Sequence, residues 1–255
     1  MVNTVPATIH ARSLSLGMQA HRACHTPPVS HVDHLVIAAA TLAQGVAWCE
    51  TTLGITPGPG GEHPLMGTHN RLFKVASYQF PQAYLEVIAI NSGAPSPRTD
   101  CASRWFDLDN SDLQRTLASD GPRLHHFVAS MTHARSGVDA LATLGIDRGP
   151  LLQASRMTPS GLLTWKITVR DDGQRLFNGT LPTLIEWGAV HPPHNMPDSG
   201  VTLQALEVCH PQAELLRNAY RAIDLNGVGI TQGPPSLVAT LHTPKGIVQL
   251  HSQGI

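Results

Sequence analysis

Two pairs of histidine and glutamate stand at matching places in two similar stretches of the chain. His34 lies in the run Val-Asp-His-Leu-Val-Ile, and Glu86 follows 52 residues later inside Tyr-Leu-Glu-Val-Ile. His126 lies in the run Leu-His-His-Phe-Val-Ala, and Glu186 follows 60 residues later inside Leu-Ile-Glu-Trp. Two imidazoles and two carboxylates suit Zn²⁺, Ni²⁺, Co²⁺, Mn²⁺ or Fe²⁺. We therefore predict one divalent metal site built from these four side chains.

The apolar surroundings of the two glutamates support this prediction. A carboxylate in a buried strand is costly unless a positive partner compensates its charge. Two observations count against the metal site. A single histidine in a strand is more often a hydrogen-bonded core residue than a ligand, and because the chain contains 15 histidines some coincidence of spacing is expected. His125 must point to the opposite face from its neighbour, so alignment with His34 selects His126 as the ligand.

The elements that must position these residues follow the same order in both stretches. A short β-branched run predicts a strand, helical spacing of apolar residues follows it, and further strand-like runs complete the unit. The first unit has a strand at 32–39, a helix at 42–53 and strands at 70–75 and 83–90. The second has a strand at 124–130, a helix at 134–144 and strands at 151–154, 162–170 and 183–187. A third, shorter repeat of this pattern at 201–250 has no metal ligand at the position that aligns with His34, which is near Leu203.

Composition limits the kind of partner. The 255 residues are 42% hydrophobic and carry a net charge of −1 without blocks of like charge, which argues against nucleic acid and anionic membranes. No apolar run approaches the roughly 20 residues that span a bilayer. The four cysteines lack paired spacing and indicate reduced thiols in a cytoplasmic protein. We expect a small-molecule substrate, and a homodimer is compatible with the sequence.

Several motifs resemble the glyoxalase-like branch of the vicinal oxygen chelate superfamily. They are Val-Asp-His-Leu-Val at 32–36, Gly-Gly-Glu-His-Pro at 60–64, Gly-Thr-His-Asn-Arg-Leu at 67–72 and Leu-Pro-Thr-Leu-Ile-Glu-Trp-Gly at 181–188. The resemblance implies an α+β fold in which paired βαβββ modules form a cup-shaped mixed sheet, with a C-terminal partial third βα repeat. The boundaries we predict are a disordered tail at 1–30, modules at 31–95 and 121–190, a connector at 96–120 and the partial repeat at 191–255.

The resemblance also implies an activity. A metal-dependent lyase or isomerase of this kind would hold two vicinal oxygens of a small substrate and stabilise an enediolate, with Glu86 or Glu186 moving the proton. Two alternatives remain open: an extradiol-type iron dioxygenase, and a metal-free binding protein similar to antibiotic-resistance relatives. Aromatic residues make up only 5% of the chain, which counts against a stacking pocket of the latter kind.

Other polar and aromatic residues are candidates for contact with the substrate. A loop histidine is usually solvated, but this loop is expected near the mouth of the cup. Arg71 offers a two-pronged donor for a carboxylate. The run Trp-Phe-Asp-Leu at 105–108 is expected to pack on the outside as part of the connector. The predicted substrate-binding residues are His63, His69, Asn70, Arg71, Arg156 and Trp165.

Overall fold

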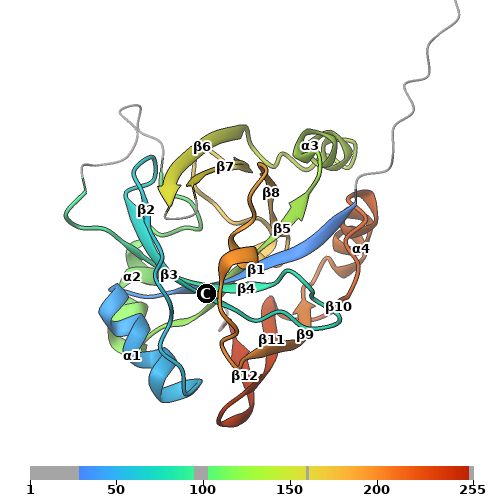
Figure 1. Ribbon diagram of the computed structural model, residues 1–255. Coiled ribbons are helices and arrows are strands. Elements are labelled where there is room, and N and C mark those ends of the chain that lie inside the picture. The colour runs from blue at the N-terminus through green and yellow to red at the C-terminus, as the bar shows by residue number, and fades with distance from the viewer. Residues whose placement is uncertain (1–28, 95–102, 159–160, 253–255) are drawn as a thin grey trace, which may run out of the picture.

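Two sheets organise the protein. The computed structural model describes residues 29–94, 103–158 and 161–252, so most of the tail predicted at 1–30 lies outside the described residues. An eight-stranded sheet has the order β2-β3-β4-β1-β5-β8-β7-β6, and a four-stranded sheet has the order β10-β9-β11-β12. Figure 1 shows the larger sheet curving from β2 round to β6, with helices outside it. The predicted α+β fold of paired βαβββ modules in a cup is therefore confirmed.

Both modules have the βαβββ element order that the resemblance implies, although the two-residue strand β2 lies in a segment that the residue pattern had indicated to be a loop. The first consists of β1 (Ser30–Ala38), α1 (Leu42–Thr52), β2 (Glu62–His63), β3 (Thr68–Lys74) and β4 (Tyr84–Ile90). The second consists of β5 (Arg123–Met131), α3 (Ala134–Ala142), β6 (Leu151–Thr158), β7 (Gly161–Thr168) and β8 (Thr183–Trp187). Helix α2 (Ser111–Asp120) lies between them, and short 3-10 turns η1 (Leu176–Gly179) and η2 (Pro192–Asn195) flank β8.

The first and last strands of each module lie side by side, and the two modules join through their first strands. β1 pairs with β4 in parallel and with β5 antiparallel, and β5 pairs with β8 in parallel. Because side chains alternate between the faces of a strand, every second residue of these central strands points into the cup. The concave side chains include Val36, Ile88, Val128 and Ile185, while Leu35, Val87, Phe127 and Leu184 belong to the core on the convex side.

Local packing explains why helix α1 can lie against the sheet. Gly45 faces β4, and a methyl group at this position would come within 2.3 Å of the Val87 side chain. Thr41 caps the start of the helix, and its hydroxyl accepts a hydrogen bond from the backbone N–H of Gln44. The absence of a side chain at Gly45 therefore sets how closely the helix approaches β4.

The third unit has the same element order but different strand pairing. It consists of β9 (Thr202–Cys209), α4 (Ala213–Ala222), β10 (Val228–Thr231), β11 (Ser236–Thr243) and β12 (Gly246–His251). Its first strand pairs in parallel with β10 rather than with the last strand. The Tyr220 hydroxyl donates to the carbonyl of Thr180 at 2.5 Å, which ties this unit to the second module. Among the described residues, no helix is long and apolar enough to cross a membrane.

Candidate functional site

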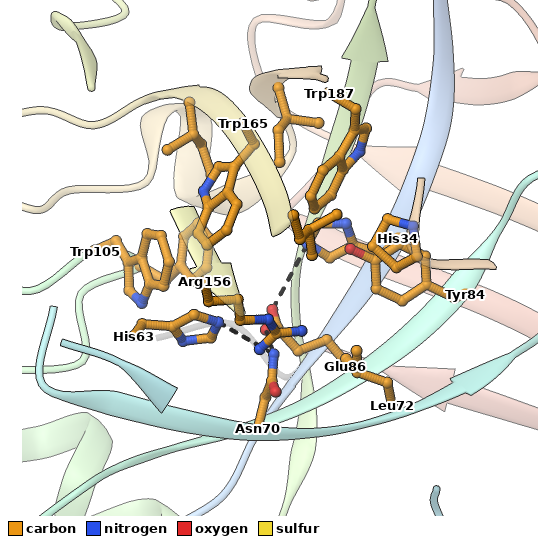
Figure 2. A pocket seen from close by; sticks show the side chains of 15 residues that line it. His34, His63, Asn70, Leu72, Tyr84, Glu86, Trp105, Arg156, Trp165 and Trp187 are labelled. Carbon is orange, nitrogen blue, oxygen red and sulfur yellow. Dashed lines mark hydrogen bonds and ion pairs between the residues drawn. The ribbon is translucent and has the colours of Figure 1, made fainter. Parts of the chain in front are cut away.

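A pocket in the cup contains the histidine and the glutamate of the first module. Figure 2 shows His34 and Glu86 facing each other there, with Arg156 between them and the indole rings of Trp105 and Trp165. The Nε2 atom of His34 lies 3.6 Å from a carboxylate oxygen of Glu86. Both side chains are buried, at 4% and 5% exposure. Strands β1 and β4 place them together because Glu86 stands opposite Val36, the next residue after His34 on the same face.

A β-bulge brings a second carboxylate behind His34. The pairing of β1 with β5 shifts between Val32 and His34, so Asp33 is the extra residue. Bulges of this kind re-aim a side chain, and they are common beside active sites. As a result, Asp33 accepts a hydrogen bond from Nδ1 of His34 at 2.7 Å although the two residues are adjacent in the strand. With Nδ1 bonded to Asp33, Nε2 is the ring nitrogen that faces Glu86.

Asp33 is fully buried and bonded on every side. Its second oxygen accepts hydrogen bonds from the indole of Trp187 at 2.9 Å and the imidazole of His191 at 2.8 Å. Burial alone would raise the pKa of Asp33, but the hydrogen bonds from His191 and His34 outweigh it and hold the pKa well below its usual range. Asp33 is therefore a fixed negative charge that orients the His34 ring. The sequence reasoning missed it, and the adjoining Asp-His pair in an apolar strand was the available signal.

The side-chain amide of Asn70 holds Glu86, and its hydrogen bonds define which way the amide points. Asn70 accepts the backbone N–H of Gly61 with its side-chain oxygen at 2.8 Å, so its nitrogen points the other way. That nitrogen donates to Glu86 at 2.6 Å and lies 3.2 Å from Nε2 of His63. One oxygen of Glu86 is thus occupied by Asn70, while the other faces His34. This fixes the carboxylate at the floor of the pocket.

His63 is buried in the neutral form. Burial and the nearby positive charge of Arg156 lower its pKa to about 3. Its Nδ1 donates to the hydroxyl of Thr68 at 3.0 Å, which leaves Nε2 to accept from Asn70. His63 therefore supports Asn70 and, through it, Glu86.

Aromatic rings form the remaining walls. Three of the four tryptophans of the chain line the pocket, together with Tyr84 and Phe106. Tyr84 stacks on His34 with ring centroids 4.6 Å apart. The outside position expected for the run at 105–108 was wrong, because Trp105 and Phe106 are buried and face the pocket. The low aromatic content of the whole chain had counted against a pocket with stacking rings. The pocket has such rings, because the aromatic residues are concentrated around it.

The second module does not bring its histidine into the pocket. His126 is completely buried, and Phe106, which does line the pocket, packs on its ring at 5.2 Å between centroids. Its Nδ1 donates to the carbonyl of Gly179, and its Nε2 accepts from the backbone of Thr183. Burial, followed by the charge of Arg148, lowers the pKa of His126 far below its ordinary value. Both ring nitrogens of this neutral imidazole are therefore in use.

The glutamate of the second module faces the other side of the sheet. Ile185 and Trp187 line the pocket, so Glu186 between them points outward. There it accepts a hydrogen bond from Lys166 at 2.6 Å and from the backbone of Ala134, at the start of α3, at 2.9 Å. The sequence pattern predicted that Glu186 faces the cup, but it lies on the other face of β8. Loops of different length in the two modules conceal which residues of the strand face inward.

Strand register identifies the true counterpart of Glu86. In the first module Val36 stands opposite Glu86, and in the second module Val128 stands opposite Thr183. The hydroxyl of Thr183 lies 3.0 Å from Nε2 of His126, in the place that the carboxylate takes beside His34. The structure thus brings His34 and Glu86 together, and it does not bring His126 or Glu186 to them.

The predicted substrate-binding residues divide according to the face on which they lie. Asn70 faces the pocket from β3, whereas its neighbours His69 and Arg71 do not line it and Arg71 is exposed. His63, Arg156 and Trp165 all line the pocket as well. Alternation along the strand therefore separates residues that the sequence grouped as one segment.

The donors in the pocket do not match the four-ligand ion that the resemblance implies. In the described parts of the chain, no group of three or more His, Cys, Asp or Glu side chains is arranged to hold a metal ion. His34 and Glu86 stand together, but the nitrogens of His126 are bonded to the protein and Glu186 points away. We therefore assign no step of the chemistry to a metal.

The chain is similar to known proteins in its sequence profile and in its fold. The sequence profile of the glyoxalase-like domain family matches residues 32–223. No curated protein sequence matches the chain. A hypothetical protein from Staphylococcus aureus superposes with a TM-score of 0.54 at 11% identity, covering 80% of this chain and 86% of that one. Methylmalonyl-CoA epimerase from Streptomyces coelicolor gives 0.40 at 16% identity, with 64% and 98% covered. The epimerase from Mycobacterium tuberculosis gives 0.35 at 14%, with 62% and 86% covered.

Proposed function

Because the chain belongs to the glyoxalase-like domain family, we propose that it is an isomerase-type enzyme that moves a proton at a carbon next to a carbonyl group of a small substrate. The observation that carries the proposal is the arrangement of His34 and Glu86 in one buried pocket, with Asp33 bonded to His34 from behind. A carboxylate and an imidazole that face each other across a gap are the groups that general acid–base catalysis requires.

Glu86 is the base in this mechanism. It takes the proton from the carbon, the electron pair of the C–H bond moves toward the carbonyl group, and an enolate oxygen forms. Where the neighbouring oxygen of the substrate is a hydroxyl group, His34 takes its proton at Nε2, because Nδ1 already donates to Asp33, and passes that proton to the enolate oxygen. Return of the proton to the same carbon, or to its neighbour, completes the isomerisation without any change in the number of electrons.

Asp33 is a positioning residue in this reaction. It touches His34 and does not face the substrate, and its fixed charge stabilises positive charge that develops on the imidazole during proton transfer. The aromatic walls exclude water from the reacting groups, which strengthens the electrostatic interactions between them.

The test is exchange of carbon-bound hydrogen with solvent. The protein is incubated in D₂O with small compounds that have a carbonyl group and a neighbouring oxygen, and loss of the C–H signal is followed by proton NMR. General acid–base groups contribute about 10²- to 10⁴-fold, so E86Q and H34Q should each lose activity by that factor. E186Q is the matched control and should retain full activity, because Glu186 faces away from the pocket. Equal activity of E86Q and the unmodified chain would refute the mechanism.

A second candidate function is binding without turnover. It is favoured by the three tryptophans and two further aromatic rings around the pocket, which suit a ligand that stacks. Tight binding of a small molecule in the absence of hydrogen exchange with any compound of the panel would favour this function over the isomerase.

A further inference from the structure

One cationic side chain in the pocket has no partner within the described structure. Arg156 enters from β6, and none of the ion pairs between described residues includes it. Its Nη1 atom is buried and makes no hydrogen bond. A buried donor without an acceptor is costly, and a bound species that accepts its hydrogen bond would remove that cost.

The loop beside Arg156 is shaped to admit the guanidinium group. A methyl group at Gly61 would come within 2.2 Å of Nη1, so glycine is the residue that leaves room for it. Gly61 also donates its backbone N–H to Asn70, the residue that holds Glu86. The free donor is therefore set next to the proposed base (Figure 2).

The unpaired charge of Arg156 favours an anionic ligand, and the acids nearby limit that ligand to one negative charge. Asp33 and Glu86 are both acidic, and Arg156 contributes the one cation without a carboxylate partner among the residues that line the described pocket. A carboxylate matches the planar guanidinium with two hydrogen bonds. A doubly charged phosphate would be repelled more strongly by the neighbouring acids.

The space beside the reacting groups is small, and it adjoins a larger apolar cavity. The pocket next to His34 and Glu86 has a volume of about 30 Å³, little more than one water molecule needs. A neighbouring cavity of about 250 Å³ shares the walls His63, Trp105, Trp165 and Ile167 with it. Its other lining residues include Leu65, Met66 and Ala154.

We propose that the substrate is a small carboxylic acid whose carboxylate pairs with Arg156 and whose unbranched apolar chain occupies the cavity lined by Met66 and Ala154. This inference rests on the proposed function, because Arg156 then holds the acid with a C–H next to a carbonyl group close to Glu86: the C–H of C2 in a 2-hydroxy acid, or of C3 in a 2-oxo acid. The cation next to that carbon stabilises the negative charge that forms when the proton leaves.

The test measures binding, with quenching of tryptophan fluorescence as the readout. The probes are straight-chain 2-oxo and 2-hydroxy acids of three to eight carbons, together with their uncharged primary amides. Affinity for the acids should rise about fourfold for each added methylene until the cavity is full, because each buried CH₂ contributes about the corresponding free energy. The amides should bind at least about tenfold more weakly than the acids, as expected when a hydrogen-bonded charge pair is lost.

Variants separate the carboxylate contact from general effects on the fold. R156M should weaken binding of the acids to the level of the amides, and G61A should do the same by displacing the guanidinium. R71M is the matched control on the exposed face of β3 and should bind like the unmodified chain. Equal affinity for acids and amides in the unmodified chain would overturn the inference, and this comparison needs no variant to fold.

The outcomes distinguish this inference from the proposed function. Binding of acids that requires Arg156, without exchange of any C–H hydrogen, would keep the carboxylate site and reject the isomerase. Hydrogen exchange that requires Glu86 but proceeds equally with acids and amides would keep the isomerase and reject the carboxylate site.

Discussion

Buried neutral histidine should make the protein sensitive to mild acid. His63 has a pKa of about 3 in the folded chain, while an unfolded histidine titrates near about 6.5. Between these values the unfolded state binds a proton that the folded state does not, so stability falls as the pH decreases. From pH 7 to pH 5, one such histidine lowers the free energy of unfolding by about 2 kcal/mol. Asp33 does not contribute in this range, because its pKa lies well below its usual value.

The measurement is urea unfolding at pH 7 and pH 5, followed by tryptophan fluorescence. H63Q retains a donor and an acceptor for Thr68 and Asn70, but it does not titrate. Between the two pH values it should lose about 2 kcal/mol less stability than the unmodified chain, whatever its stability at pH 7. H242Q, on an exposed side chain of β11, is the control and should follow the unmodified chain. An unchanged pH dependence in H63Q would refute the neutral, buried state of His63.

Three further predictions concern single contacts. W187F removes the indole donor to Asp33 and should lower the free energy of unfolding by about 1–3 kcal/mol, measured by urea unfolding; no change would mean that the bond is not made. G45A should destabilise the chain by about 1–3 kcal/mol, despite the better helix propensity of alanine, because its methyl group meets Val87; a rise in melting temperature would contradict this. Addition of Ni²⁺ or Zn²⁺ followed by elemental analysis should give the same metal content for E186Q as for the unmodified chain, and a lower content would place Glu186 at an ion after all.

Most of the order of helices and strands could be predicted from the sequence, because it depends on local residue patterns. Strand β8 was predicted with its observed ends, and β1, β4 and α1 were predicted within one or two residues of theirs. His34 and Glu86, which the structure brings together, were selected from the sequence because a charged residue in an apolar strand requires a compensating partner. The pairing within the third unit was not accessible, since the same element order is compatible with more than one strand arrangement.

Only part of the site could be predicted from the sequence, because the direction of a side chain depends on the register of its strand. A shift of one residue moves a side chain to the other face, and loop lengths conceal such shifts. This is why Glu186 was chosen instead of Thr183, and why Asp33, which lies in a bulge, was overlooked. Trp105 and Phe106 were misplaced because no sequence pattern shows that a connector folds back into a cup.

Among the described residues, His34, Trp187 and His191 donate to Asp33 from three separate segments: β1, the end of β8 and the start of the turn η2. If any one of these segments opened locally, a charge would remain in a dry interior with fewer partners, at considerable cost. The segments should therefore open together as a single cooperative unit. Amide hydrogens on β1 and β8 near this carboxylate are expected to exchange with solvent at a common rate, although they lie more than 150 residues apart in the chain.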